Sequence, residues 1–394
     1  MLRLSQRRLR VGTLFSGIGA FEQALLQMKI PHEIVFACDN GERYIKGKNG
    51  RVLEKEEIAA LFPDLTGDAL ERKVEELYDK TGKPNNVKKS YFANYDISEE
   101  RWHTDVRFMD GVKYRGKVDI LVGGSPCQSF STYGLKKGLE DARGTLFYDY
   151  ARMIQEVQPK VFIYENVRGL VLHDKGNTWN IIKVVFDSLD YDIGTPKVLN
   201  AQDYGLPQMR KRLFVVGIKK SLGVGAFRYP SKIPLVDKAS DLKYEKPAKD
   251  VPIEYYLPEK GYKWVTEVER SQNKARLNRD IIGCQTAVQQ YNWSGDFRLE
   301  EAKPEHKKPN SGVFVTRYTG PDEKLREEFS GKDVVVRKLM PEECFNLMGF
   351  KNFKIHPDLV GQDQVLYRQA GNSIAVPVLI ALLKELKKQV FERA

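Results

Sequence analysis

The sequence predicts an α/β protein with a doubly wound, mostly parallel sheet, followed by a second, smaller and loop-rich domain. Short apolar runs rich in branched residues recur through the first 220 residues, and each precedes a helical pattern. Their apolarity is continuous rather than alternating, which is typical of strands covered by helices on both faces. After about residue 220 the helical periodicity is lost, which indicates the second domain. The predicted strands are residues 9–15, 33–38, 118–124, 160–166 and 212–218.

The predicted domains follow from these changes of pattern. Residues 1–219 carry the strands and form the larger domain, and residues 337–394 return with helical segments whose apolar face should dock back onto it. Residues 43–90 interrupt the strands with charged residues at helical spacing, which indicates a helical insertion packed on the outside. Residues 220–336 are rich in Pro and Lys and form the smaller domain.

Composition limits the class of protein. Of the 394 residues, 41% are apolar, which is enough for a full-sized core. The net charge of +11 favours a polyanionic partner through counterion release, and a basic surface without a partner is the alternative. The four Cys and five His are scattered without metal-site spacing, so we expect no metal. No apolar segment is long enough to span a membrane, so we expect a soluble, cytoplasmic protein.

The first predicted strand ends in LFSGIGAFEQAL, where Gly17 and Gly19 form a tight turn into a helix whose N-terminus can face a ligand. Glu22 stands where a dinucleotide fingerprint has its third glycine, and a carboxylate there would repel a pyrophosphate. Asp39 ends the second strand, where it could accept hydrogen bonds from ribose hydroxyls. A nucleoside cofactor without a pyrophosphate, such as S-adenosylmethionine, fits these features. A structural turn beside a solvated Asp is the alternative.

The segment GGSPCQSFS places Cys127 just after the strand at 118–124, where Pro126 fixes the preceding backbone. A cysteine in such a turn can present its sulfur to a cleft as a nucleophile, and a buried structural cysteine is the alternative. Glu165 follows four apolar residues at the end of the next predicted strand, so it should lie beside Cys127. A carboxyl there can keep a raised pKa and donate a proton, although a helix cap or a partner for an arginine is equally open.

The segment QMRKRLFVVG places Gln208, Arg210 and Arg212 in alternation on a strand, so both arginines should share one face. Two inward cations would bind a phosphate or a carbonyl oxygen and would favour a thiolate. A solvated edge strand is the alternative.

Together these segments resemble the cytosine carbon-5 DNA methyltransferases, of the bacterial restriction-modification type. The resemblance covers roughly residues 10–42, 91–218 and 337–390, and implies a Rossmann-like, class I S-adenosylmethionine-dependent methyltransferase fold. The unmatched region before residue 337 falls where that family has its target-recognition domain. Six ordered segments carry the resemblance: TLFSGIGAFE, GGSPCQSFS, IYENVRGL, QMRKRLFVVG, RKLMPEECFNLMGF and YRQAGNSIAVP.

The resemblance implies a catalytic role for four residues. Cys127 would be the nucleophile that adds to carbon 6 of a cytosine, and Glu165 would contact ring nitrogen 3 and the exocyclic amine. Arg212 would hold the base carbonyl oxygen, and Arg210 would lie beside the nucleophile.

The resemblance also implies a set of cofactor contacts. Phe15 would contact the adenine ring, Asp39 the ribose, Asp105 the adenine amine and Ser373 the methionine end. Asn40 departs from the family because many members have an aromatic residue there that stacks on adenine. The expected set is completed by Ser16, Gly17, Gly19, Pro126, Leu146 and Asn372, with the two glycines letting the backbone approach the cofactor closely.

Contacts with DNA are expected from two regions. The segment QSFSTYGLKKGLEDARGTLF, after Cys127, is polar, basic and glycine-punctuated, as expected of a mobile loop that closes over a flipped-out base. A surface loop that only connects two elements is the alternative. In the second domain we single out Arg317 as a base-reading candidate. The remaining expected contacts are Ser131, Lys136, Lys137, Arg143 and Gln208.

The sequence therefore predicts a sequence-specific DNA cytosine-5 methyltransferase that uses S-adenosylmethionine and binds double-stranded DNA. As a bacterial or phage-encoded modification enzyme, it would share its site with a cognate restriction endonuclease and act as a monomer. Two alternatives stay open: the same chemistry on structured RNA such as transfer RNA, and a DNA-binding relative without catalysis.

Overall fold

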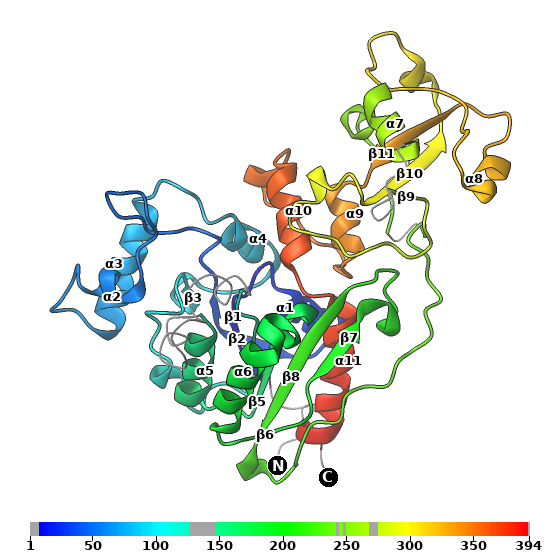
Figure 1. Cartoon of the computed structure of the whole chain (residues 1–394). Coiled ribbons are helices and arrows are strands. Elements are labelled where there is room, and N and C mark those ends of the chain that lie inside the picture. The colour runs from blue at the N-terminus through cyan, green and yellow to red at the C-terminus, as the bar shows by residue number, and fades with distance from the viewer. Residues whose placement is uncertain (1–7, 127–145, 242–243, 247–249, 268–274, 393–394) are drawn as a thin grey trace.

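A computed structural model describes residues 8–126, 146–241, 244–246, 250–267 and 275–392, and it divides into a larger and a smaller unit (Figure 1). Within the described residues, eight strands of the larger unit form one sheet, in the order β3-β2-β1-β4-β5-β8-β6 with β7 also paired to β8. The strands are β1 (Leu9–Leu14), β2 (His32–Cys38), β3 (Trp102–His103), β4 (Ile120–Gly123), β5 (Val161–Val167), β6 (Tyr191–Ile193), β7 (Lys197–Asn200) and β8 (Lys211–Lys219).

The central strands form because their apolar runs are buried on both faces. Alternate residues of β5 enter different cores: Ile163 packs with α1 (Ala20–Gln27) and α11 (Val376–Leu386), and Phe162 packs with α5 (Leu146–Val157) and α6 (Asn177–Asp187). Each such side chain contributes about 1.5–3 kcal/mol when fully buried. The sheet is therefore covered by helices on both sides (Figure 1).

The last helices of the chain return to the larger unit. They are α9 (Pro341–Asn346), α10 (Asp363–Asn372) and α11, and α11 packs on α1 through Leu379 and Leu383. Side chains of α11 such as Leu379 lie in the same core cluster as Val11 and Ile163 of the sheet.

Residues 43–90 contain α2 (Lys55–Ala59), α3 (Gly67–Asp79) and the start of α4 (Asn86–Asn94), joined by non-helical segments, and their status as an insertion stays a prediction. Asn85 caps α4, because its side chain accepts a hydrogen bond from the backbone of Lys88. Val74 and Tyr78 of α3 bury their side chains against Phe108 of the larger unit. The insertion is therefore anchored beside β3.

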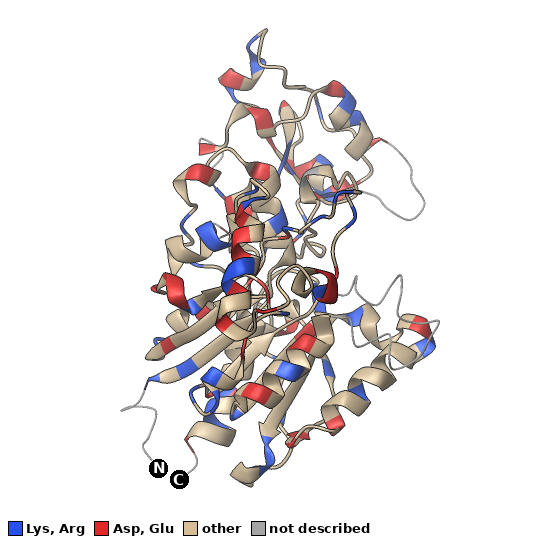
Figure 2. Ribbon diagram, turned by 90° about the vertical axis from the view of Figure 1, so that its left-hand side faces the viewer, with Lys and Arg blue, Asp and Glu red and all other residues tan. Residues whose placement is uncertain are grey.

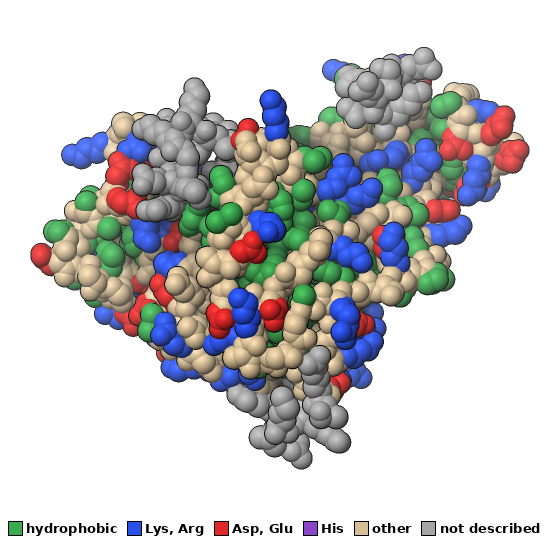
Figure 3. Space-filling model, turned by 60° about the horizontal axis from the view of Figure 1, so that its bottom comes forward, with side chains coloured by type: hydrophobic (Ala, Val, Ile, Leu, Met, Phe, Trp, Pro, Cys, Tyr) green, Lys and Arg blue, Asp and Glu red, His purple; other side chains and the backbone are tan. Residues whose placement is uncertain are grey.

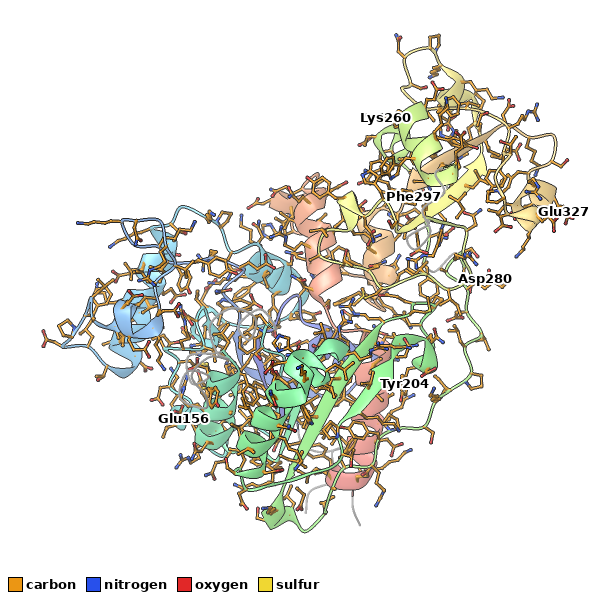
Figure 4. All side chains as sticks on the ribbon, viewed as in Figure 1. Glu156, Tyr204, Lys260, Asp280, Phe297 and Glu327 are labelled. Carbon is orange, nitrogen blue, oxygen red and sulfur yellow. The ribbon has the colours of Figure 1, made fainter. Side chains whose placement is uncertain are left out.

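The smaller unit has its own sheet and core. In the described residues its strands are β9 (Arg276–Leu277), β10 (Asp296–Glu301) and β11 (Val334–Lys338), flanked by α7 (Glu259–Thr266) and α8 (Glu323–Glu328). Phe297 packs in this core with Tyr262 and Leu325, one from each helix. Figure 4 labels Phe297 on β10, together with Lys260 of α7 and Glu327 of α8. The side view of Figure 2 shows this unit stacked on the larger one.

The predicted α/β fold class is confirmed, with a mostly parallel sheet. The five predicted strands correspond to β1, β2, β4, β5 and β8. No pattern predicted β3, β6 or β7, which have only two to four residues. The sheet is also less parallel than its sequence pattern indicates, because β8 runs antiparallel to β5, β6 and β7. The domain boundaries stay predictions, and β11 extends past the one at residue 336.

Candidate active site

The candidate site lies at the carboxyl ends of β1, β4 and β5. Leu14, Gly123 and Tyr164 are neighbours across these parallel strands, so the residues after them come to one edge of the sheet. Ligands of open α/β sheets bind at this edge. Phe15 and Glu165, two predicted site residues that are far apart in the sequence, therefore lie at the same edge of the sheet.

In the turn after β1, every second residue has a positive φ: Phe15 at 52°, Gly17 at 53° and Gly19 at 77°. A Cβ at Gly17 would meet no atom within 4 Å, so that side of the turn is open to a ligand. A Cβ at Gly19 would lie 2.1 Å from the Tyr95 ring. The sequence predicted that Gly19 lets the backbone approach the cofactor. In the structure it is the Tyr95 ring that lies close to Gly19, which corrects that prediction.

The Ser16 hydroxyl ties the ends of β1 and β2 together. It donates to the Thr13 or Cys38 carbonyl oxygen, at 3.1 and 3.2 Å, and accepts from the Cys38 backbone N–H at 3.0 Å. Ser16 thus shapes the turn through its side chain, and its predicted contact with the cofactor stays a prediction.

Asp39 lies opposite this turn. Its carboxylate accepts hydrogen bonds from the backbone N–H of Gly17 at 2.9 Å and of Gly41 at 2.8 Å. Burial raises the pKa of Asp39, which the two N–H donors partly oppose. The predicted ribose contact therefore also fixes the glycine turn.

Glu22 does not face the ligand side of the turn. Its side chain is 1% exposed and accepts hydrogen bonds from the hydroxyls of Thr13 at 3.0 Å and Tyr91 at 2.6 Å. Burial raises the pKa of its carboxyl. The prediction that Glu22 would repel a pyrophosphate is therefore wrong, because its carboxyl points into the core.

Asp105 follows β3 and is almost fully surrounded by donors. Tyr78 of the insertion donates its hydroxyl to Oδ2 at 2.8 Å, and the guanidinium of Arg107 donates to both carboxylate oxygens. Burial raises the pKa of Tyr78 well above its usual range. The insertion, to which the sequence assigned no chemistry, thus contacts a predicted cofactor residue.

Asn372 and Ser373 end α10, and Asn372 donates to Glu42 in the loop after β2 at 2.8 Å. Ser373 is buried, and Leu146 and Phe15 both pack against the core under the site. Pro126 is the last described residue before the gap and is exposed. The predicted cofactor residues therefore come from the ends of β1, β2, β3 and β4, from the start of α5 and from the end of α10.

Glu165 and Arg212 form an ion pair across neighbouring strands, with 3.3 Å between Oε1 and Nε. Burial raises the pKa of Glu165, and the charge of Arg212 opposes that rise. A Cβ at Gly124 would lie 2.5 Å from the Glu165 carbonyl oxygen, so only glycine allows β4 to end this close. The carboxyl can thus hold a proton and still have a cation beside it.

The backbone that precedes Cys127 is fixed from β5. Asn166 donates its amide to the Ser125 carbonyl oxygen at 2.9 Å and to the Tyr164 hydroxyl at 2.8 Å. Cys127 and the loop residues Ser131, Lys136, Lys137 and Arg143 lie outside the described residues.

Arg210 is buried and holds the two units together through backbone oxygens. It donates to Gln285 at 2.9 Å, Gly371 at 2.8 Å and Ser373 at 2.6 Å. Burial and the charge of Arg212 lower the pKa of Arg210 to about 10. Both guanidinium groups lie within 3.9 Å of the Cys284 sulfur, so they are close together. Arg210 itself precedes β8, which begins at residue 211.

Gln208 is 0% exposed, and its amide donates to the Leu347 carbonyl oxygen at 2.6 Å and accepts from the Gln285 backbone at 3.2 Å. This buried position is closed to DNA, which corrects the predicted contact. The Arg317 side chain is 58% exposed and forms an ion pair with Asp333 at 2.9 Å. This pair lies in the smaller unit, whose sheet is separate from the one that contains β5.

The family model of C-5 cytosine-specific DNA methylases matches residues 69–388. The chain belongs to this family. The methylase is 35% identical over 277 residues to the Type II methyltransferase M.HpaII of Haemophilus parainfluenzae, covering 70% of this chain and 73% of that protein. It is 34% identical over 264 residues to M.HhaI of Haemophilus parahaemolyticus, covering 66% and 73%.

The methylase also resembles solved structures over nearly its whole length. The Schizosaccharomyces pombe (S. pombe) Dnmt2 methyltransferase superposes with a TM-score of 0.61 at 18% identity, covering 98% of this chain and 100% of that one. This likeness shows the fold. The family names DNA as the substrate, so the RNA alternative and the non-catalytic alternative are not favoured.

Several residues of the methylase site had no assigned role in the sequence. Asn166 stood within a quoted motif, but only its contact with Ser125 indicates what it does. Cys284 and Tyr78 come from segments without a motif, and no sequence signal could have placed them here. Among the described residues no group of His, Cys, Asp and Glu could hold a metal ion. None of the described helices has the length and apolarity to cross a lipid bilayer.

Proposed function

We propose that this methylase transfers a methyl group from S-adenosylmethionine to carbon 5 of a flipped-out cytosine within a specific sequence of duplex DNA. The ion pair of Glu165 and Arg212 at the carboxyl edge of the sheet carries this proposal. A partly buried acid, 13% exposed, and a neighbouring cation match the ring nitrogen and carbonyl oxygen of cytosine.

The residues at the β1 turn fit the cofactor. Gly17 leaves space open beside the turn, and the half-buried Asp39 lies at its edge, where its carboxylate can also accept from ribose hydroxyls. We assign Phe15, Asp39 and Asp105 to the adenosine moiety, and Asn372 and Ser373 to the methionine end. When bound, S-adenosylmethionine would supply an electrophilic methyl group, and breaking its sulfur–methyl bond would leave S-adenosylhomocysteine.

Cys127 supplies the nucleophile. Its thiolate forms a bond from sulfur to carbon 6, and the ring electrons move toward carbon 5, which makes an otherwise weak carbon nucleophile reactive. Glu165 holds a proton at ring nitrogen 3 as negative charge develops, which its raised pKa favours. Arg212 stabilises the charge on the carbonyl oxygen.

Release restores the aromatic ring. After methylation, carbon 5 loses its proton to a base, and those electrons re-form the double bond between carbons 5 and 6 as the carbon–sulfur bond breaks. Cys127 leaves as the thiolate with which it began. Asn166 supports both stages because it fixes the backbone two residues before the sulfur.

Duplex DNA is the expected partner, because the chain carries a net charge of +11. Lys and Arg side chains are spread over both units on the face in Figure 3, with acidic side chains among them. The smaller unit would read the target, with Arg317 as a candidate. We further propose a monomeric, cytoplasmic modification enzyme with a cognate restriction endonuclease. Two of its relatives are named Type II methyltransferases.

Bisulfite sequencing of DNA from cells that express the chain tests the proposal. Protected cytosines should fall in one short sequence and disappear in Cys127→Ala. Cys344→Ala is the matched control, because that thiol is buried in α9. Protection that survives in Cys127→Ala would overturn the mechanism. If the folded wild-type protein protects no cytosine, the proposal that DNA is the substrate is overturned, and transfer RNA would be assayed next.

A further inference from the structure

One face of α3 contacts three consecutive residues of the larger unit. Glu71, Glu75 and Tyr78 are four and three residues apart, so they lie on the same side of the helix. Glu71 hydrogen-bonds the ring of His103, Glu75 accepts from the Thr104 hydroxyl at 3.3 Å, and Tyr78 donates to Asp105 at 2.8 Å. The helix therefore fixes the path of residues 103–105, not only one side chain.

Asn85, at the end of the same insertion, fixes the second acid of the pocket. Its amide donates to the Asp39 carbonyl oxygen at 2.9 Å, while its own oxygen caps α4. A Cβ at Gly41 would lie 2.2 Å from the side-chain oxygen of Asn85, so only a glycine at position 41 lets the loop after Asp39 pass this close to Asn85. The two acids assigned to the cofactor are thus both held by residues of the insertion.

We propose that residues 43–90 are the scaffold of the cofactor pocket, with Tyr78 and Asn85 as positioning residues for Asp105 and Asp39. The inference rests on the proposed cofactor assignment. It gives a role to a segment that contributes none of the expected cofactor contacts itself.

Asp105 accepts hydrogen bonds from Tyr78 and from Arg107, and we infer that the adenine amine replaces a donor from Arg107 while Tyr78 keeps its own. A carboxylate has about four lone-pair sites, and Arg107 and Tyr78 together occupy them. An adenine amine can therefore bind only if one donor leaves. Tyr78 is 1% exposed, whereas the Arg107 side chain is 16% exposed and is the more accessible of the two donors. Tyr78 then holds Oδ2 while Arg107 gives way.

Tyr78→Phe removes only the hydroxyl and tests this role. Calorimetric titration with S-adenosylhomocysteine should show about tenfold weaker binding, since a hydrogen bond to a charged group is lost. At saturating cofactor, kcat should stay close to wild type, because Tyr78 does not touch the reacting atoms. Tyr191→Phe is the matched control: its buried hydroxyl donates to Pro159, on the opposite edge of the sheet, and its loss should leave cofactor affinity unchanged.

Two further measurements separate positioning from general stability. If Tyr78 acts through Asp105, the effects of Tyr78→Phe and Asp105→Asn should not add in a double-mutant cycle. Wild type should also prefer S-adenosylhomocysteine to S-inosylhomocysteine, which lacks the amine, and Tyr78→Phe should lose much of that preference. Additive effects with an unchanged preference would overturn the inference.

Asn85→Ser keeps the capping oxygen and removes the amide donor, so it gives a second, independent variant. It should weaken S-adenosylhomocysteine binding several-fold without lowering the melting temperature more than Tyr191→Phe does. Wild-type affinity in both Asn85→Ser and Tyr78→Phe would overturn the scaffold. Failure of the wild-type protein to bind S-adenosylhomocysteine would instead overturn the cofactor assignment in the proposed function.

Discussion

Glu22 illustrates how one buried carboxyl makes stability depend on pH. It accepts hydrogen bonds from Thr13 and Tyr91 in the core, and burial raises its pKa. An acid whose pKa is higher in the folded state favours folding when it is protonated. That contribution is complete below the ordinary pKa of glutamate, about 4.3, and is lost as the pH rises through the folded value.

Glu22→Gln should therefore gain stability relative to wild type as the pH rises. The amide keeps an oxygen for Thr13 and Tyr91 but cannot ionise. Urea unfolding at about pH 5 and about pH 8 should show the difference between the two proteins moving in favour of the variant at the higher pH. Glu76→Gln, at an exposed position paired with Lys73, is the control and should show no such trend. A difference that moves in favour of the wild type as the pH rises would contradict the assigned direction.

The β1–α1 turn shows at the scale of an element why two glycines with similar φ are not equivalent. Gly17 and Gly19 both have left-handed backbone, which costs other residues about 1–2 kcal/mol. Gly17 has open space where a side chain would stand, whereas Gly19 faces the Tyr95 ring. The first glycine is thus available to a ligand and the second belongs to the packing of the protein.

Gly17→Ala should consequently lose about 1–2 kcal/mol of unfolding free energy from backbone strain alone. Gly19→Ala should lose clearly more, because the added methyl must also displace Tyr95. Cofactor affinity should fall in Gly17→Ala even where the protein is fully folded. Urea unfolding with calorimetric titration of both variants measures the two effects, and equal losses of stability would refute the distinction.

The sequence predicted the long strands because continuous apolar runs such as Val161–Val167 have no other stable environment than a covered sheet. It could not predict β6 and β7, since Tyr191–Ile193 and Lys197–Asn200 are short and are strands only because β8 pairs with them. Likewise, Asp39 was recognisable from its place after a strand. The burial of Gln208 was not, because it depends on Leu347 and Gln285 from distant segments.

At the scale of the whole molecule, a buried ionic cluster joins the smaller unit to α9. Arg337 of β11 is 0% exposed and donates to Glu300 of β10 at 2.6 Å and to Glu343 of α9 at 2.8 Å. Buried charges of this kind need every partner, because removing one leaves the others without compensation. The contact between the units therefore depends on a complete set of charges.

Arg337→Met should destabilise the protein by about 3–5 kcal/mol, since two carboxylates lose their buried cation. Arg326→Met, which breaks an exposed pair with Glu323, is the control and should cost less than about 1 kcal/mol. Urea unfolding followed by tryptophan fluorescence measures both variants. A loss in Arg337→Met no larger than in the control would show that the cluster does not hold the units together.

The packing of α11 on α1 ties the order of synthesis to the order of folding. Phe21 and Leu25 of α1 leave the ribosome early, yet the helix that covers them is made only after the entire smaller unit. During that interval the nascent chain carries an open apolar surface, which is where chaperones bind and where aggregation begins. The larger unit cannot mature before its neighbour, so catalytic competence arrives only with the synthesis of residues 376–386.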